Sequence, residues 1–88
     1  MPTFVKIEKG IVDKPTFDSN VPAHLEFVRG LNAEGRNAKT GYWARFGGGM
    51  MIFEADSRKE AEDIVSRDPL VQQKCVEYEL HEWKILAG

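Results

Sequence analysis

The segment that most constrains the fold is a strand-like stretch at residues 49–55, GMMIFEA, which is apolar on both of its faces. A strand with one solvated face alternates apolar and polar residues. Here Met50, Met51, Ile52 and Phe53 follow one another without interruption. Both faces of this strand must therefore be covered by other parts of the protein.

Three glycines, Gly47 to Gly49, separate this stretch from a preceding strand that we predict over residues 36–46. Glycine permits the positive φ angles that a tight hairpin turn needs. A glycine-rich loop can also hold a phosphate, but no helix follows these glycines to present its N-terminus to an anion. We therefore predict a turn and an antiparallel strand pair.

A helix is predicted to follow, because Ser57-Arg58-Lys59-Glu60 matches the S-x-x-E capping box. Pro69 disfavours a helical conformation at Asp68, which places this carboxylate at or just past the helix end. The inward stripe of this helix is predicted to contain Ala61, Ile64 and Val65.

An earlier helix is predicted at residues 22–31, PAHLEFVRGL, and it carries a histidine in its apolar arc. The arc is formed by Val21, Leu25, Phe27, Val28 and Leu31, with His24 near its middle. Burying an imidazole costs free energy unless it is hydrogen-bonded, and Asp68 is the candidate partner. We expect the segment Gly10–Asn20 to be a loop, Ser19 or Asn20 to cap the helix, and Gly35 to end it.

The first and the last strand of the chain complete the pattern. In FVKIEK at residues 4–9, Val5 and Ile7 share one face, while Lys6 and Glu8 share the other with Phe4. The last strand begins at Val76, and its alternation becomes irregular at Trp83 and Ile85, which suggests a bulge.

The resulting order is β-α-β-β-α-β, the ferredoxin-like arrangement in the α+β class. We predict one domain over residues 1–88, with an antiparallel four-stranded sheet and two helices on one face. A chain this short buries only roughly 60 to 65% of the surface that its unfolded form exposes, so contact with a second subunit is a useful source of further burial. The second apolar face of residues 49–55 is therefore predicted to meet another copy of the chain, sheet against sheet, as a homodimer. Assembly beyond a dimer stays open.

Composition excludes several classes of protein. The net charge is −2 and no Lys/Arg-rich patch occurs, so the electrostatic pattern of a nucleic-acid binder is missing. No apolar run could span a bilayer and the first residues do not resemble a signal peptide, so we expect a cytoplasmic protein without a membrane partner. Cys75 is the single cysteine, which rules out a disulfide or a cysteine metal cluster within one chain.

Several motifs resemble the YciI-related family of small dimeric α/β-barrel proteins. They are His24 followed by LEFVRGLNAEGR, Thr40-Gly41 before the hairpin, the segment GGGMMIFEADSRKEAEDIVSRDPLV, and the final VEYELHEWKI. The resemblance implies a ferredoxin-like fold that dimerises through its sheets, and a site made of His24 and Asp68. It also implies chemistry such as removal of chloride from a chlorinated hydroxyhydroquinone, which one relative performs. Tyr42 stands where the family usually has proline.

These residues support one catalytic hypothesis. An imidazole whose second nitrogen meets a carboxylate is suited to general acid/base work, because the carboxylate fixes the tautomer and stabilises the imidazolium. We expect a lyase, dehalogenase or isomerase acting on a small aromatic or enolisable substrate, with His24 and Asp68 as catalytic residues and no metal or organic cofactor. The substrate pocket is expected to include Phe27, Gly41, Tyr42 and Met51.

Structural interpretations remain open beside it. His24 can be a hydrogen-bonded core residue, and Asp68 can cap a helical turn through Leu70 to Gln73. Cys75 is expected to pack as a small hydrophobe, and His81 lacks a second metal ligand at suitable spacing. The competing function is a non-catalytic dimeric module that binds a small molecule or serves as an accessory subunit. A third hypothesis, a protein acting by interaction alone, would need an exposed apolar patch outside the dimer contact.

Overall fold

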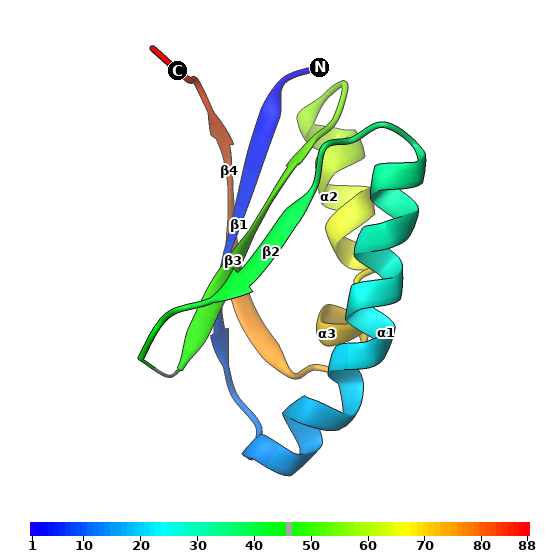
Figure 1. Ribbon diagram of the computed structural model, residues 1–88, viewed down its shortest axis with the longest axis vertical. Helices are drawn as coiled ribbons and strands as arrows, with labels where there is room; N and C mark the ends of the chain where they lie inside the picture. Colours follow the sequence, from blue (N-terminus) through cyan, green and yellow to red (C-terminus); the bar gives the residue numbers. More distant parts are fainter. Residues whose placement is uncertain (46) are drawn as a thin grey trace.

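The computed structural model describes residues 1–45 and 47–88, which form one sheet with helices on one side. Its elements are β1 (Thr3–Gly10), α1 (Lys14–Ala33), β2 (Lys39–Tyr42), β3 (Gly48–Glu54), α2 (Arg58–Ser66), α3 (Pro69–Gln72) and β4 (Val76–Trp83). The strands pair antiparallel in the order β2-β3-β1-β4. Figure 1 shows that the helices cover one face of the sheet and leave the other open. The predicted ferredoxin-like α+β fold is confirmed.

The strand β3 has the two apolar faces that its sequence requires. Met51 and Phe53 point toward the helices and are fully buried. Met50 and Ile52 lie on the open face, where Met50 is 36% exposed. Helices therefore account for one face only, as the element order predicts.

The hydrophobic core lies between the sheet and the two long helices. Phe4 of β1 stacks on Phe53 of β3 with ring centroids 6.1 Å apart, and both side chains are fully buried. The helices contribute Val28 and Leu31 from α1 and Ala61, Ile64 and Val65 from α2, which confirms the predicted stripe of α2. Leu25 was assigned to the inward arc of α1, but it is 41% exposed. The buried line of α1 runs instead through His24, Val28 and Leu31, and Leu25 lies about 100° away from His24 around the helix.

The expected loop at Gly10–Asn20 is wrong, because most of it is helical. α1 begins at Lys14, where the carboxylate of Asp13 accepts a hydrogen bond from the backbone N–H of Thr16 at 3.0 Å and Pro15 lies in the first turn. This is the cap-and-proline signature that the sequence repeats further on. Pro22 lies inside the helix, exposed to solvent, so the carbonyl that its missing N–H leaves unpaired can reach water. Although α1 has 20 residues, no described helix is both long and apolar enough to cross a membrane.

The hairpin uses its glycines differently from the prediction. The first strand of the hairpin, β2, covers only Lys39–Tyr42 of the predicted residues 36–46. It does not extend over residues 36–38 or 43–45, and Phe46 lies outside the described residues. Of the three glycines in the hairpin, only Gly47 has a positive φ, +101°. Gly48 and Gly49 belong to β3, and an added Cβ would stand 2.1 Å from the carbonyl oxygen of Glu8 or 2.0 Å from that of Gly41. These two glycines allow close approach of neighbouring strands.

The remaining boundaries follow from local contacts. β4 pairs with β1 without interruption from Gly10↔Val76 to Thr3↔Trp83, so the expected bulge is absent from the strand. Ser57 caps α2 as predicted, by accepting from the N–H of Glu60.

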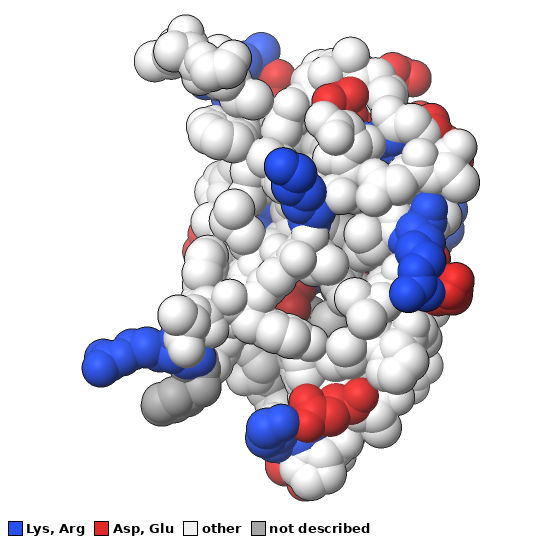
Figure 2. Space-filling model, viewed as in Figure 1, with Lys and Arg blue, Asp and Glu red and all other residues white. Residues whose placement is uncertain are grey.

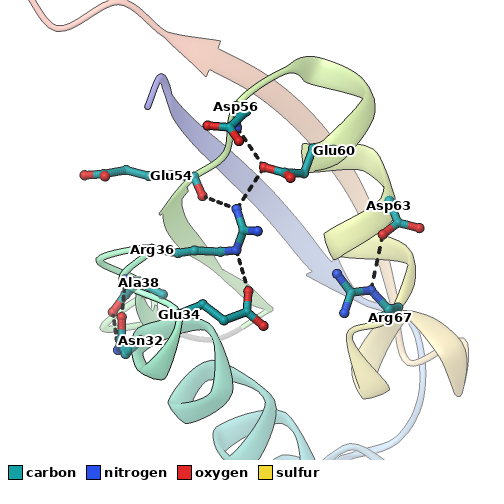
Figure 3. A network of polar contacts seen from close by, with 9 residues as sticks. All are labelled: Asn32, Glu34, Arg36, Ala38, Glu54, Asp56, Glu60, Asp63 and Arg67. Carbon is teal, nitrogen blue, oxygen red and sulfur yellow. Dashed lines mark hydrogen bonds and ion pairs between the residues drawn. The ribbon is translucent and has the colours of Figure 1, made fainter.

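The end of α1 is joined to β3 and α2 by a single guanidinium (Figure 3). Arg36, which follows α1, donates to Glu34 at 2.7 Å, to Glu60 at 2.9 Å and to the carbonyl of Glu54 at 3.2 Å. Glu60 also accepts from the N–H of Asp56, one residue before the N-cap that a standard capping box uses. The hydrogen bond from Arg36, with that from Asp56, lowers the pKa of Glu60.

We predict that Gly49→Ala destabilises the fold while Gly30→Ala stabilises it. The new methyl at position 49 would clash with the backbone of β2, at a cost of about 1–3 kcal/mol or more. Position 30 has nothing within 4 Å and lies inside α1, so alanine there should add about 0.5–1 kcal/mol. Urea unfolding of both variants measures whether each substitution lowers or raises the free energy of unfolding. The same change in stability for both variants would show that β3 does not need a glycine where it lies against the backbone of β2.

Candidate active site

Asp68 is placed by the break between α2 and α3. α2 ends at Ser66, and Pro69 starts α3 with Asp68 in an extended conformation (φ −63°, ψ 125°). Its Oδ1 accepts the backbone N–H of Leu70 at 3.0 Å, so the predicted capping interaction is present. The carboxylate is fully buried, which means that its remaining lone pairs must find partners inside the protein.

His24 reaches this carboxylate from α1. The distance from Nδ1 of His24 to Oδ1 of Asp68 is 2.8 Å, and the imidazole is 4% exposed. The structure therefore brings together the two residues that the sequence singled out. An ionised Asp68 can only accept, so the proton of a neutral ring lies on Nδ1. Nε2 then accepts from the hydroxyl of Thr40, 2.9 Å away on β2.

Two further charged residues complete the cluster, and the sequence analysis missed them. Lys6 of β1 is fully buried, with Nζ 2.7 Å from Oδ2 of Asp68 and 2.6 Å from Oε1 of Glu8. Glu8 is 8% exposed. The alternation in β1 already places Lys6 and Glu8 on the face of Phe4. The missing step was to recognise that the helices cover this face rather than the face of Val5 and Ile7.

The electrostatics favour an ionised Asp68. Burial alone would raise the pKa of this carboxyl group, but the hydrogen bond from His24 and the charge and hydrogen bond of Lys6 outweigh it and lower the pKa. Glu8, Lys6 and Asp68 carry formal charges that add to −1. A proton on His24 brings this sum to zero, so the site can accept one proton and then carries no net charge.

A cavity of about 620 Å³ opens at the end of the sheet beyond this cluster. It is lined by Gly10, Val12, Lys14, Phe17, Asp18, Tyr42, Trp43, Arg45, Gly47 and Gly48. Figure 2 shows the molecule hollowed between the sheet and α1, with an acidic group at the bottom of the hollow. Three of its lining residues are aromatic, Phe17, Tyr42 and Trp43, and the rings of Phe17 and Tyr42 meet edge to face with centroids 6.0 Å apart.

The expected pocket residues divide between this cavity and other places. Tyr42 lines the cavity, but Met51 is fully buried in the core and Phe27 packs against it. Gly41 is exposed on β2. Neither His24 nor Asp68 is among the lining residues, and Phe17 precedes His24 by two turns, about 10 Å along α1.

The other candidates take structural places. Cys75 is fully buried beside Leu70 and Val76, as expected for a small hydrophobe, and burial raises the pKa of its thiol. His81 is exposed on β4 with its Nε2 3.1 Å from Glu79.

An antiparallel four-stranded sheet with helices on one face, and a buried His–Asp pair between the layers, defines a ferredoxin-like α+β protein with a candidate acid/base site. The sequence pattern of the YCII-related domain matches residues 5–84, and the chain belongs to this family. It is 39% identical over 66 residues to the uncharacterized protein YjpA of Bacillus subtilis (strain 168), covering 75% of this chain and 78% of that protein.

Solved structures share the fold. 5-Chloro-2-hydroxyhydroquinone dehydrochlorinase (TftG) from Burkholderia phenoliruptrix AC1100, in complex with 2,5-dihydroxybenzoquinone, matches with a TM-score of 0.75 at 22% identity over 93% of each chain. The de novo designed protein Ferredog-Diesel matches with a TM-score of 0.64 at 12% identity, over 93% of this chain and 85% of the design.

We predict that Asp68 contributes stability that acid removes. Its pKa is lowered in the folded state from 3.8, so the contribution is complete above pH 3.8 and is lost as the pH falls through the folded-state value. Asp68→Asn should cost about 3–5 kcal/mol at neutral pH, because it breaks a buried ion pair. The free energies of unfolding of the variant and of the wild type should approach each other below pH 3.8. Urea unfolding from about pH 7 to about pH 2.5 measures both values.

The control for this prediction is Asp63→Asn. Asp63 faces Arg67 across 3.4 Å, but its side chain is 68% exposed, so its loss should change stability little at any pH. A constant gap between the Asp68→Asn variant and the wild type over the whole pH range would contradict the prediction.

Proposed function

We propose that this chain is a small cytoplasmic acid/base enzyme in which His24 transfers a proton and Asp68 orients its ring. The observation that carries the proposal is the pair of contacts on the imidazole. Nδ1 is committed to Asp68 at 2.8 Å, which leaves Nε2 as the atom that can gain or lose a proton. A structural histidine could be satisfied by any acceptor, whereas the ionised Asp68 also stabilises the imidazolium that forms when Nε2 takes a proton.

The chemistry follows from the charge of the cluster. When Nε2 takes a proton from a phenol or from carbon next to a carbonyl, the imidazolium neutralises the negative cluster, and the electron pair stays on the substrate as a phenolate or an enolate. Return of the same proton to another position would complete an isomerisation. Expulsion of a halide by that electron pair would complete a dehydrohalogenation. Neither course requires the protein to supply an electron or a cofactor.

The substrate is proposed to enter at the cavity beside Tyr42. Thr40 and Tyr42 are two residues apart on β2, so their side chains share the helix-facing side of the sheet, about 7 Å apart. The Thr40 hydroxyl, bonded to Nε2 and half-buried, lies between the imidazole and this cavity. An aromatic cavity fits a small planar substrate. The dihydroxybenzoquinone bound to TftG is a molecule of this kind.

A specific observation favours a second candidate function, a non-catalytic binding module. His24 is 4% exposed and does not line the cavity, so the imidazole is closed to solvent in this conformation. In that case the cavity would bind a small molecule and the His–Asp pair would serve the fold. The two functions differ in whether Nε2 becomes accessible.

We expect 5-chloro-2-hydroxyhydroquinone to release chloride in the presence of the wild-type protein, and His24→Ala or Asp68→Asn to reduce this rate at least about 100-fold, as loss of general acid/base catalysis does. Chloride is followed with an ion-selective electrode. His81→Gln is the matched control, since the exposed second histidine has no part in the site.

Diethyl pyrocarbonate, which modifies accessible unprotonated imidazoles, tests access to Nε2 in the same samples. His24 should be modified in the His81→Gln protein, and 2,5-dihydroxybenzoquinone should slow the reaction. If His24 is unreactive and chloride is released only at the uncatalysed rate, the proposed enzyme function is wrong and the non-catalytic binding module is the remaining function.

The open face of the sheet is proposed to join two copies of the chain. Val5, Ile7, Met50 and Ile52 form its apolar centre, and Ile7 is 39% exposed. A face of adjacent apolar strand residues on a chain of 88 residues is typical of a sheet-to-sheet contact. A dimer would cover the second face of β3.

We predict that Ile7→Asp converts a dimer into a monomer and that Leu25→Asp does not. The two side chains are equally exposed, at 39% and 41%, but Leu25 lies on α1, away from the sheet. Sedimentation equilibrium gives the mass of each variant. A wild-type monomer, or a dimer that Leu25→Asp disrupts instead, would contradict the assignment of the interface.

A further inference from the structure

Lys6 is a charged residue on the buried face of the sheet. Its neighbours across the strands are Met51 and Leu80, and Phe4 lies two residues earlier on the same face. These three side chains are buried, and Lys6 itself is fully buried. An ammonium group in such surroundings loses its hydration, so only charged partners can hold it there.

Both of its partners are carboxylates on the helix-facing side. Nζ bridges Asp68 at 2.7 Å and Glu8 at 2.6 Å. Asp68 in turn accepts from three elements, since Lys6 of β1, His24 of α1 and the N–H of Leu70 in α3 all donate to it. Lys6 is the one donor of these three that carries a permanent charge at neutral pH.

The effect of Lys6 on Asp68 is opposite to that of burial. A carboxyl group without water tends to hold its proton, and a protonated Asp68 could no longer serve solely as an acceptor for Nδ1 of His24. The ammonium removes this tendency. The tautomer of His24 thus depends on a residue that the imidazole does not contact in any described hydrogen bond.

We propose that Lys6, held in place by Glu8, is a positioning residue that keeps Asp68 ionised and thereby keeps the proton of neutral His24 on Nδ1, with Nε2 unprotonated as the acceptor for Thr40. The inference rests on the proposed function only for its catalytic meaning, because the tautomer can be measured without a substrate.

Glu8 has a separate part in this arrangement. It gives Lys6 a second partner that does not touch His24, and it retains 8% exposure at the cavity end of the cluster. The titratable groups that face the cluster come from four elements: Lys6 and Glu8 from β1, His24 from α1, Tyr42 from β2, and Tyr78 of β4, which pairs with Glu8. Tyr42 lies close enough to Glu8 for that carboxylate to help raise the pKa of its phenol, after burial and Asp18.

The test is the double variant Lys6→Met/Glu8→Gln compared with Glu8→Gln alone. The double variant removes Lys6 without leaving Glu8 unpaired in the interior, and the formal charge of the three positions stays at −1, as in the wild type. The single variant keeps the contact between Lys6 and Asp68. Methionine and glutamine are close in size to the residues that they replace, so the packing around β1 is preserved.

Two NMR signals report the result: the carboxyl carbon of Asp68 during an acid titration, and the ring nitrogens of His24 at a pH where the ring is neutral. In the wild type and in Glu8→Gln, Asp68 should titrate below 3.8 and Nδ1 should carry the proton. In the double variant, the midpoint of Asp68 should rise and a substantial fraction of the Nε2–H tautomer should appear. A merely structural lysine would leave both signals unchanged in a folded variant.

Two outcomes would overturn the inference. One is an unchanged Asp68 midpoint and tautomer in a folded double variant. The other needs no variant: a wild-type protein whose neutral His24 carries its proton on Nε2. The wild-type measurement keeps the inference testable even where the double variant does not fold. A lack of chloride release with the expected NMR changes would refute the proposed enzyme and leave the positioning role of Lys6 intact.

Discussion

The carboxylate of Asp68 is the interaction on which the arrangement of the layers depends. It caps α3, binds the imidazole of α1 and pairs with the ammonium of β1, and it does so without any exposure to solvent. Each contact compensates part of the cost of burying a charge, a cost of several kcal/mol per ion. Removal of one partner leaves the others uncompensated. The position of α1 over the sheet is therefore fixed by polar contacts as well as by packing.

The space between the sheet and the helices consequently has an apolar end and an end that opens at the cavity. Near α2, Phe4, Phe53 and Ile64 form a dry core, and Arg36 closes this end with ion pairs. At the other end a row across the sheet runs from Tyr42 through Gly49 to Glu8. Gly49 contributes no side chain to this row, and Tyr42 lines the cavity. The charged cluster lies between the dry end and the open end.

The sequence predicted the fold well because its signals are local. The capping box at Ser57, the two-faced strand β3 and the Asp68-Pro69 break each act over a few residues, and each was found where expected. The start of α1 was missed because Pro22 was taken as its beginning, although Asp13 and Pro15 offer the same signal.

The site was predictable only in part, for a physical reason. His24 and Asp68 each stand out, the first as a polar residue in an apolar arc and the second by its place before a proline. Lys6 and Glu8 do not stand out, because the alternation of a strand does not show which of its two faces is buried. Only the packing of the helices determines which face is buried. The cavity is lined by residues from the start of α1 and from the hairpin between β2 and β3, and no single segment of the chain contains that information.

The fold of this chain does not by itself require the buried charges of Lys6, Glu8 and Asp68. A designed protein with 12% identity matches the backbone of this chain, so the ferredoxin-like fold needs little more than the correct pattern of covered positions. Nothing in that pattern requires a lysine between Met51 and Leu80. Replacing a buried ion pair with well-packed apolar residues is often neutral or stabilising by about 1–4 kcal/mol. Packing alone therefore does not explain Lys6, Glu8 and Asp68 in the interior, and their contacts lead to the ring of His24, on which we propose that their combined charge acts.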